Sequence, residues 1–347
     1  MTDLSNSVHD FNFALMSMHD KDRDLDERYL KAQNFKGLKG KKLSFILSAL
    51  YGSRNANIVI LSHINLLLVA WIIKAFSSNT RIIMFAHGIE VWSDLPHWKK
   101  KFLQRKVEIW AVSKYTSRRL SELHQIDLEN VKIINNCLDP FFQPPTNFTK
   151  SPELIDRYGL TNDQQILFTL TRLSSQESYK GYDRVLLTLP ELIKDFPRLR
   201  YIIAGKADDL ERNRVNELIK HLGVENHVSL IGFVKDDELD SHLLLGDIFI
   251  MPSSNEGFGI VFIEAASNGC KVIAGNIDGS VDALMNGDLG SLVDPNDLSQ
   301  IASAIRNNFI SKKKPQEIQD KCLQNFSYGG YFDKIKELIL PSKNIVA

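Results

Sequence analysis

The sequence alternates short apolar runs rich in Ile, Val and Phe with longer stretches of helical spacing along most of its length. This alternation is typical of β-α-β units, in which helices connect parallel strands. The expected strands are 11–18, 57–63, 81–88, 108–113, 131–136, 165–173, 200–205, 227–234, 248–254, 271–276 and 290–294. The pattern therefore predicts an α/β chain made of doubly wound domains.

A proline-rich segment divides the chain near its middle. The 347 residues exceed the size of one typical domain, and Pro140, Pro144 and Pro145 prevent a continuous helix or central strand between the two halves. We therefore expect one domain over 1–148 and a second over 149–325. Ligands of open α/β sheets bind beyond the carboxyl ends of the strands, so a cleft between the two domains is the expected binding place.

The composition indicates which partners the chain is not built to bind and in which compartment it is expected. The 42 basic residues balance 42 acidic ones, so the chain lacks the strong positive field of a dedicated nucleic-acid binder. Cys137, Cys270 and Cys322 follow no disulfide or metal spacing, and the polar residues 1–10 do not resemble a secretory leader. These features predict a cytoplasmic protein.

Two segments raise the question of a membrane. The apolar run 58–76 approaches the length of a spanning helix, but Ser62, His63 and Asn65 interrupt it, so we expect a buried strand followed by a buried helix. The segment 95–106 mixes five basic residues with aromatic and apolar ones. Two interpretations of it stay open, a solvated helix whose apolar stripe joins the core and a peripheral contact at the inner face of a membrane.

The stretch 253–269, SSNEGFGIVFIEAASNG, sets Glu256 and Glu264 eight residues apart around Gly257 and Gly259. Glycines at the start of a helix let backbone N–H groups approach a ligand, and the helix dipole favours an anion there. A solvated turn before an ordinary amphipathic helix is the simpler alternative. We interpret the stretch as a site for a phosphorylated ligand.

The same stretch also matches a dinucleotide fingerprint, but poorly. In G-F-G-I-V-F, Phe262 occupies the place of the third glycine, although Asp278 lies about twenty residues further on. That glycine normally permits close packing of helix on strand. A dehydrogenase is therefore the weaker interpretation.

A second stretch, TRLSSQESYKGYD at 171–183, carries two candidate phosphate ligands. Arg172 and Lys180 follow the first expected strand of the second domain and precede a helix. Taken singly, each would be an ordinary surface cation. Together at a strand end, a bidentate guanidinium and an ammonium suit a diphosphate.

These two stretches, about seventy residues apart, strongly resemble the second domain of the retaining glycosyltransferases of family 4, which have the two-Rossmann GT-B fold. The resemblance extends to AHGIEVW, WAVSKYTSRRL, IINNCLDPFF and FSYGGYFDKIKELI. It implies two Rossmann-like domains that face a central cleft, with a final helix over 326–347 that crosses back onto the first domain.

The resemblance assigns roles by position. It implies that Arg172 and Lys180 bind the donor diphosphate, Glu256 the transferred sugar and Glu264 the nucleotide ribose, while His87 faces the sugar. His87, Arg172, Lys180 and Glu256 are the catalytic candidates. The candidate donor-binding residues are Arg172, Lys180, Gly232, Phe233, Val234, Glu256, Gly257, Phe258, Gly259, Ile260 and Glu264.

The resemblance further implies transfer of a hexose with retention, from a nucleotide diphosphate sugar to a carbohydrate or lipid-linked acceptor. A UDP-sugar is favoured and a GDP-sugar is left open. No D-x-D motif is present, and Ala207–Asp209 is interpreted as acids at a helix start, so no metal and no cofactor are expected.

The chain departs from the family at its beginning. The expected strand 11–18 resembles the family's second strand, and nothing before it resembles the usual opening strand and glycine-rich loop. A nucleotide-sugar-binding subunit without catalytic activity of its own is therefore the alternative function. Apolar surface left by a missing strand would also favour an oligomer.

Overall fold

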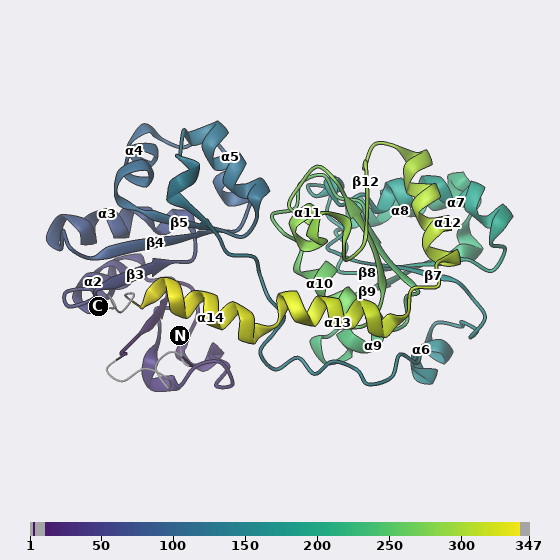
Figure 1. The fold of residues 1–347 in the computed structure, drawn as a ribbon, viewed down its shortest axis with the longest axis horizontal. Coiled ribbons are helices and arrows are strands. Elements are labelled where there is room, and N and C mark those ends of the chain that lie inside the picture. Colours follow the sequence, from purple (N-terminus) through teal and green to yellow (C-terminus); the bar gives the residue numbers. More distant parts are fainter. Residues whose placement is uncertain (1–2, 4–10, 341–347) are drawn as a thin grey trace, which may run out of the picture.

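The first lobe of the computed structural model is built on a four-stranded parallel sheet (Figure 1), and the structure describes residue 3 and residues 11–340. Its strands are β3 (Ile58–Leu61), β4 (Arg81–Ala86), β5 (Glu108–Ala111) and β6 (Val131–Ile133), in that order across the sheet. Its helices are α2 (Lys42–Gly52), α3 (Leu67–Phe76), α4 (His97–Lys106) and α5 (Lys114–His124). All four helices share one apolar core with the sheet, because right-handed crossovers that step in one direction keep helices on one face.

The beginning of the described chain forms a separate pair of strands. β1 (Leu15–Ser17) and β2 (Phe35–Gly37) pair in parallel with each other and are not hydrogen-bonded to the four-stranded sheet. The strand expected over 11–18 is thus shorter than expected, because its partner β2 offers only three residues for pairing. β2 itself was not expected, since Lys36 and Gly37 give it little strand character.

The apolar run 58–76 is a strand followed by a helix, as expected. β3 and α3 occupy it, and Leu67, Ala70 and Ile73 of α3 are buried in the core of the first lobe. Over the described residues, the chain has no helix whose length and apolar character would let it cross a membrane.

The second lobe has a six-stranded parallel sheet in the order β12-β11-β10-β7-β8-β9. Its strands are β7 (Ile166–Leu170), β8 (Arg200–Ala204), β9 (Val228–Gly232), β10 (Ile248–Met251), β11 (Lys271–Gly275) and β12 (Ser291–Val293). The strand order reverses between β7 and β10, and the loops that follow these two strands therefore diverge to leave a binding crevice.

Helices cover both faces of this second sheet. They are α6 (Pro152–Arg157), α7 (Tyr182–Asp195), α8 (Asp209–Leu222), α9 (Leu239–Leu243), α10 (Ile260–Ser267), α11 (Ser280–Ala283), α12 (Leu298–Ile310) and α13 (Pro315–Phe326). α7, α8 and α12 share one core, whereas α9, α10, α11 and α13 contribute to the other. This arrangement is doubly wound.

Helix α14 (Tyr328–Ile339) follows α13 directly and runs from the second lobe to the first (Figure 1). Its Ile335 and Ile339 pack with Ile83 and Trp110, on the sheet face opposite α2–α5. The Nη1 group of Arg81 also donates to the carbonyl of Leu338 at 2.9 Å. α14 therefore covers the second face of the first sheet.

Candidate functional site

The glycine turn between β10 and α10 is organised by one buried carboxylate. Asp278, 2% exposed, accepts hydrogen bonds from the Glu256 amide at 2.7 Å and from the Ser253 hydroxyl at 2.9 Å. Burial raises the pKa of Asp278 to about 6 against the opposing effect of these donors. Sequence reasoning missed this role, because Asp278 was considered only as part of a dinucleotide fingerprint.

Helix α10 begins at Ile260, directly after Gly259, whose φ of 81° favours glycine. Ile260 is 43% exposed at this helix end, while the Phe258 side chain is buried, 5.9 Å from the ring of Phe326. The side chain of Phe258 therefore belongs to the core, and only its backbone is available to a ligand. Glu256 lies before the helix and Glu264 inside it.

Lys180 and Glu256 form an ion pair, with side chains 15% and 14% exposed. Lys180 comes from the loop after β7, and the adjacent Gly181 brings that loop against the loop after β10. A Cβ at Gly181 would lie 2.2 Å from the carbonyl oxygen of Pro252. The structure thus joins two site residues that the sequence placed in separate stretches.

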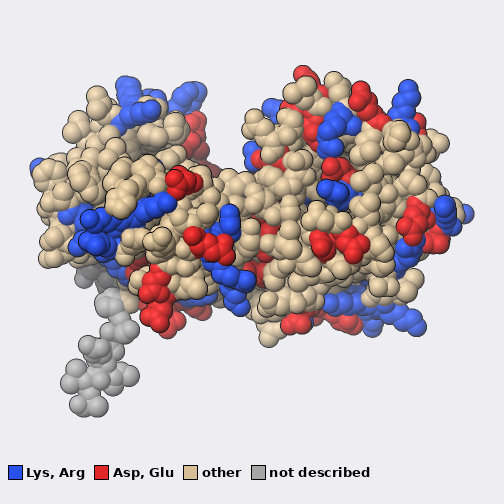
Figure 2. Space-filling view, turned by 90° about the horizontal axis from the view of Figure 1, so that it is seen from above, with Lys and Arg blue, Asp and Glu red and all other residues tan. Residues whose placement is uncertain are grey.

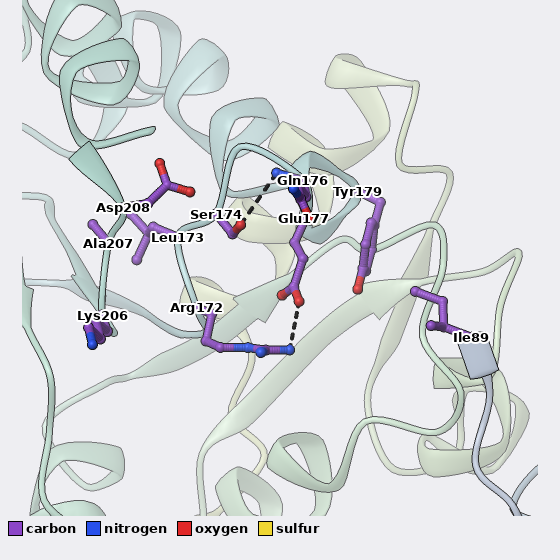
Figure 3. A pocket seen from close by; sticks show the side chains of 10 residues that line it. All are labelled: Ile89, Arg172, Leu173, Ser174, Gln176, Glu177, Tyr179, Lys206, Ala207 and Asp208. Atoms are coloured by element: carbon purple, nitrogen blue, oxygen red, sulfur yellow. Dashed lines mark hydrogen bonds and ion pairs between the residues drawn. The ribbon is translucent and has the colours of Figure 1, made fainter. Parts of the chain in front are cut away.

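Arg172 lines an open pocket of about 460 Å³, together with Glu177 and Tyr179 of the loop that carries Lys180 (Figure 3). Its Nη2 group donates to Oε1 of Glu177 at 2.6 Å, while the Arg172 side chain is 76% exposed and that of Glu177 only 17%. The second carboxylate oxygen of Glu177 is buried and has no hydrogen-bond partner among the described residues. Sequence reasoning did not single out Glu177, although it stands between the two candidate cations.

The remaining lining of the pocket comes from three chain segments. Tyr179 stands next to Glu177 and Ile89 reaches in from the first lobe, whereas Lys206 lies on the far side of Arg172 (Figure 3). Burial, with Glu177 and Glu256 nearby, raises the pKa of Tyr179 to about 12. Lys206 was also missed, since a lone lysine after a strand carries no signal of its own.

The two lobes meet at the glycine turn. A Cβ at Gly257 would lie 1.8 Å from the carbonyl oxygen of His87, so the first lobe approaches the turn too closely for any side chain there. The His87 side chain is exposed and its ring stacks on Phe85, with centroids 5.9 Å apart. The structure therefore places His87 beside the glycine turn, at the border between the lobes.

The carboxyl group of Glu264 is largely buried and has acidic neighbours. Burial is the main cause that raises its pKa to about 7, and the nearby acids Asp240, Asp139 and Asp236 add to it. None of the ion pairs of the described chain includes Glu264. Glu264 thus differs from Glu256, which is paired with Lys180.

The candidate base pocket follows β9. Gly232 has a φ of 77°, Phe233 is 71% exposed and Val234 is buried. The carbonyl of Gly232 accepts a hydrogen bond from the amide of Gly205 at 2.7 Å, which ties this end of β9 to the loop after β8. The strand end therefore presents one exposed ring and a fixed backbone.

The basic segment 95–106 contains helix α4. In α4, Phe102 and Leu103 are buried, which agrees with the interpretation of 95–106 as a helix whose apolar stripe joins the core. Figure 2, seen from the side where α4 and α5 lie in Figure 1, shows patches of Lys and Arg over the first lobe with some Asp and Glu among them, and both signs of charge mixed over the second lobe.

The acids at 207–209 stand at the beginning of α8, as expected. Asp208 is the N-cap of that helix, and its carboxylate accepts from the amide of Glu211 at 2.8 Å. Across the described part of the chain, no group of three or more His, Cys, Asp or Glu side chains is arranged to hold a metal ion.

Residues 150–322 match the family described as glycosyl transferases group 1. The second lobe belongs to this family. Among curated relatives of this chain, a GDP-mannose-dependent alpha-(1-6)-phosphatidylinositol monomannoside mannosyltransferase from Mycobacterium tuberculosis is 30% identical over 247 residues, 68% of this chain and 62% of the relative. Its counterpart from Mycolicibacterium smegmatis is 29% identical over 242 residues, 65% of this chain and 60% of the relative. The matched part thus spans less than two thirds of either relative.

Solved structures confirm the GT-B fold. A glycosyltransferase from Rickettsia africae superposes with a TM-score of 0.73 at 22% identity and covers 90% of this chain and 86% of its own. HepE from Anabaena, solved in complex with UDP, gives a TM-score of 0.75 at 19% identity, with 91% of this chain and 88% of its own covered. At these identities the likeness concerns the fold alone.

Proposed function

We propose that the chain is a retaining hexosyltransferase that moves a sugar from a nucleotide diphosphate to a carbohydrate or lipid-linked acceptor. The observation that carries the proposal is the ion pair of Lys180 with Glu256. Lys180 shares the loop after β7 with Arg172, and Gly257, next to Glu256, lies against the backbone of His87 from the other lobe. Two cations and one carboxylate at the carboxyl ends of β7 and β10 suit a ligand that has a diphosphate at one end and hydroxyl groups at the other.

Each group then has a defined task. Arg172 and Lys180 offset the negative charge that grows on the nucleoside diphosphate as its bond to the sugar breaks, so they stabilise the transition state more than the bound substrate. Glu256, released from Lys180 by the phosphates, accepts hydrogen bonds from sugar hydroxyls. His87 contacts the sugar from the first lobe, and closure of the lobes excludes water. The acceptor hydroxyl attacks from the face that the diphosphate leaves, which retains the anomeric configuration.

The nucleotide itself lies along the second lobe in this proposal. Glu264 accepts hydrogen bonds from the ribose, and the backbone of Gly232–Val234 reads the base while the exposed ring of Phe233 offers a stacking surface. A pocket that contacts the base mainly through backbone atoms distinguishes one base from another only weakly. UDP-hexoses and GDP-hexoses are therefore both candidate donors. The sequence favoured a UDP-sugar, whereas the names of the mycobacterial relatives favour GDP-mannose. No metal ion or cofactor takes part, since the two cations and the start of α10 meet the charge of the diphosphate.

We place the protein in the cytoplasm, with a peripheral contact at the inner face of the membrane. The basic segment 95–106 contributes to that contact through its lysines, because its apolar residues Phe102 and Leu103 are in the core. A lipid-linked acceptor would meet the site there, as the phosphatidylinositol monomannoside in the names of the mycobacterial relatives suggests.

One observation favours the alternative of a donor-binding subunit. The β1–β2 pair is not hydrogen-bonded to the four-stranded sheet, so the sheet of the first lobe has fewer strands than the six-stranded sheet of the second. Such a subunit would bind nucleotide sugars and transfer nothing by itself.

A donor panel separates the two functions. Thermal shift and hydrolysis are measured with UDP-glucose, GDP-mannose and an ADP-sugar, with NAD as the control for the dehydrogenase interpretation. We expect stabilisation and slow release of the nucleoside diphosphate with one of the first two donors. Stabilisation without hydrolysis or transfer, even with mixed glycan and lipid acceptors, would support the subunit, and stabilisation by NAD alone would contradict both.

A further inference from the structure

Helix α2 exposes an apolar stripe that the donor site does not use. Leu43, Leu47 and Tyr51 follow each other at intervals of four residues and are 78%, 67% and 75% exposed. At this spacing the three side chains share one face of the helix. The opposite face holds the buried Phe45. The stripe is therefore not part of the core that α2 makes with the sheet.

The neighbouring helix α3 extends this apolar surface. α2 packs on α3, where Leu68 and Trp71 are 46% and 51% exposed while Leu67 and Ala70 are fully buried. Indole and phenol rings suit a boundary between water and hydrocarbon, because each joins an apolar body to a polar edge. We call Leu43, Leu47, Tyr51, Leu68 and Trp71 the α2–α3 stripe.

The chain segment that carries the stripe has charges of a single sign. From residue 32 to residue 89 the chain has no Asp or Glu, and its basic residues there are Lys36, Lys39, Lys41, Lys42, Lys74, Arg54 and Arg81. Lys36 donates to Ser48 of α2 at 3.0 Å, and the Arg54 guanidinium lies 5.6 Å from the centre of the Tyr51 ring. The cations thus flank the stripe itself.

Most of these cations are available to an external anion. Lys36, Lys39, Lys41, Lys42 and Arg54 are exposed, and none of them forms an ion pair with an acid of the described chain. An exposed apolar stripe with unpaired cations along it is the pattern of a helix that lies in the interface of an anionic membrane.

We propose that the α2–α3 stripe docks the first lobe onto a bilayer that contains anionic lipids. The stripe inserts into the boundary between headgroups and acyl chains, while the flanking lysines and Arg54 meet the lipid phosphates. This surface differs from the segment 95–106, whose apolar residues face the core. It depends on neither the donor site nor the identity of the sugar.

A second copy of the chain fits the α2–α3 stripe less well than anionic lipid does, because of its charge. A two-fold dimer through this surface would bring the same residues of both copies together. Because exposed cations without an ion-pair partner in the described chain flank the stripe, that contact would bring the cations of one copy close to those of the other. Anionic lipid meets the same residues with the opposite charge.

The test is flotation of the full chain with vesicles of phosphatidylcholine alone and of phosphatidylcholine mixed with phosphatidylglycerol. We expect the protein to float with the mixed vesicles, and less so at high salt. The variant Leu43→Gln/Leu47→Gln/Tyr51→Gln should lower the apparent partition coefficient about tenfold or more, since three apolar side chains no longer leave water. Leu210→Gln is the matched control, because Leu210 is 75% exposed on α8 of the second lobe.

Two further measurements keep the result specific. Thermal unfolding and nucleotide binding of the triple variant should match those of the unaltered chain, because the exchanged residues are exposed and far from the donor site. Vesicles with brominated acyl chains should quench tryptophan emission in the unaltered chain and less in Trp71→Phe. Equal flotation of the unaltered chain and the triple variant, or flotation of neither, would overturn the proposal. A dimer that the triple variant converts to a monomer, without vesicle binding, would assign the surface to a second copy and overturn it as well.

Discussion

Lys180 and Glu256 form an ion pair although they are 76 residues apart in the sequence and belong to loops after different strands. Both side chains are largely buried, so neither charge is well solvated by water. A ligand that brings phosphate to Lys180 must therefore offer Glu256 another partner, and sugar hydroxyls are such a partner. The pair thus links the two ends of a nucleotide sugar.

Replacement of Glu256 should separate nucleotide binding from transfer. In Glu256→Ala, we expect the affinity for UDP or GDP to stay within about threefold, because Lys180 keeps its charge, while transfer falls about a hundredfold or more. Isothermal titration with the diphosphate and a transfer assay measure the two effects. Glu256→Gln, which keeps the shape, is the matched variant. Equal losses of affinity and transfer would reject the sugar-binding role.

Removal of both cations should abolish the diphosphate site. Charged hydrogen bonds contribute about 1.5–3 kcal/mol each, so Arg172→Ala/Lys180→Ala should weaken nucleoside diphosphate binding by at least about a hundredfold. Arg198→Ala is the control, because Arg198 is an exposed arginine paired with Asp163. Calorimetry that finds the same affinity in the double variant would refute the phosphate assignment.

Glu177 should compete with the donor for Arg172. Its carboxylate holds the guanidinium at 2.6 Å and adds negative charge beside the proposed phosphate position. We expect Glu177→Gln to tighten UDP or GDP binding about twofold to fivefold, in line with one partly exposed ion pair. The gain should shrink in high salt. Weaker binding in this variant would show instead that Glu177 positions Arg172 for the phosphate.

Gly257 should control how closely the lobes approach each other. A methyl group there would lie 1.8 Å from the His87 carbonyl, so Gly257→Ala should push the first lobe away. We expect a larger radius of gyration in small-angle scattering and a fall in transfer of about a hundredfold, because a small displacement at a reacting centre is costly. Gly329→Ala, where the added methyl meets nothing within 4 Å, is the matched control. An unchanged scattering profile with full transfer would contradict this role.

Glu264 should make stability depend on pH. Its pKa is about 7 in the folded chain against an ordinary value of 4.5, so between these values the folded state binds more protons than the unfolded state. The free energy of unfolding therefore falls as pH rises through this window. At pH 8, Glu264→Gln should therefore unfold at a higher temperature than the unaltered chain. The corresponding gain in the free energy of unfolding is at most about 3 kcal/mol.

The difference should be largely lost at pH 4, which lies below the pKa of Glu264 in both states. Thermal unfolding followed by circular dichroism at several pH values measures it. Glu153→Gln, at the exposed start of α6, is the control that should show no such trend. A stabilisation that does not vary with pH would show that the ionisation of Glu264 is not its cause.

The sequence alone determined the architecture and most of the candidate residues. Alternating apolar runs predict parallel strands joined by helices because their spacing is a local property, and the eleven expected runs all contain a strand of the structure. The positions of Arg172, Lys180, Glu256 and Glu264 followed from motifs that can be read along the chain. The lengths of the strands did not, since the extent of β1 depends on the short partner β2.

Only the tertiary structure decided which of these residues meet. The ion pair of Lys180 with Glu256, the control of the turn by Asp278, and the approach of His87 to Gly257 join segments far apart in the sequence. Glu177 became a candidate because folding places its carboxylate beside Arg172 and away from water. Likewise, Leu43, Leu47 and Tyr51 of α2 face outwards, while Phe102 and Leu103 of α4 face inwards. Such outcomes depend on the packing of whole elements, for which the sequence has no local signal.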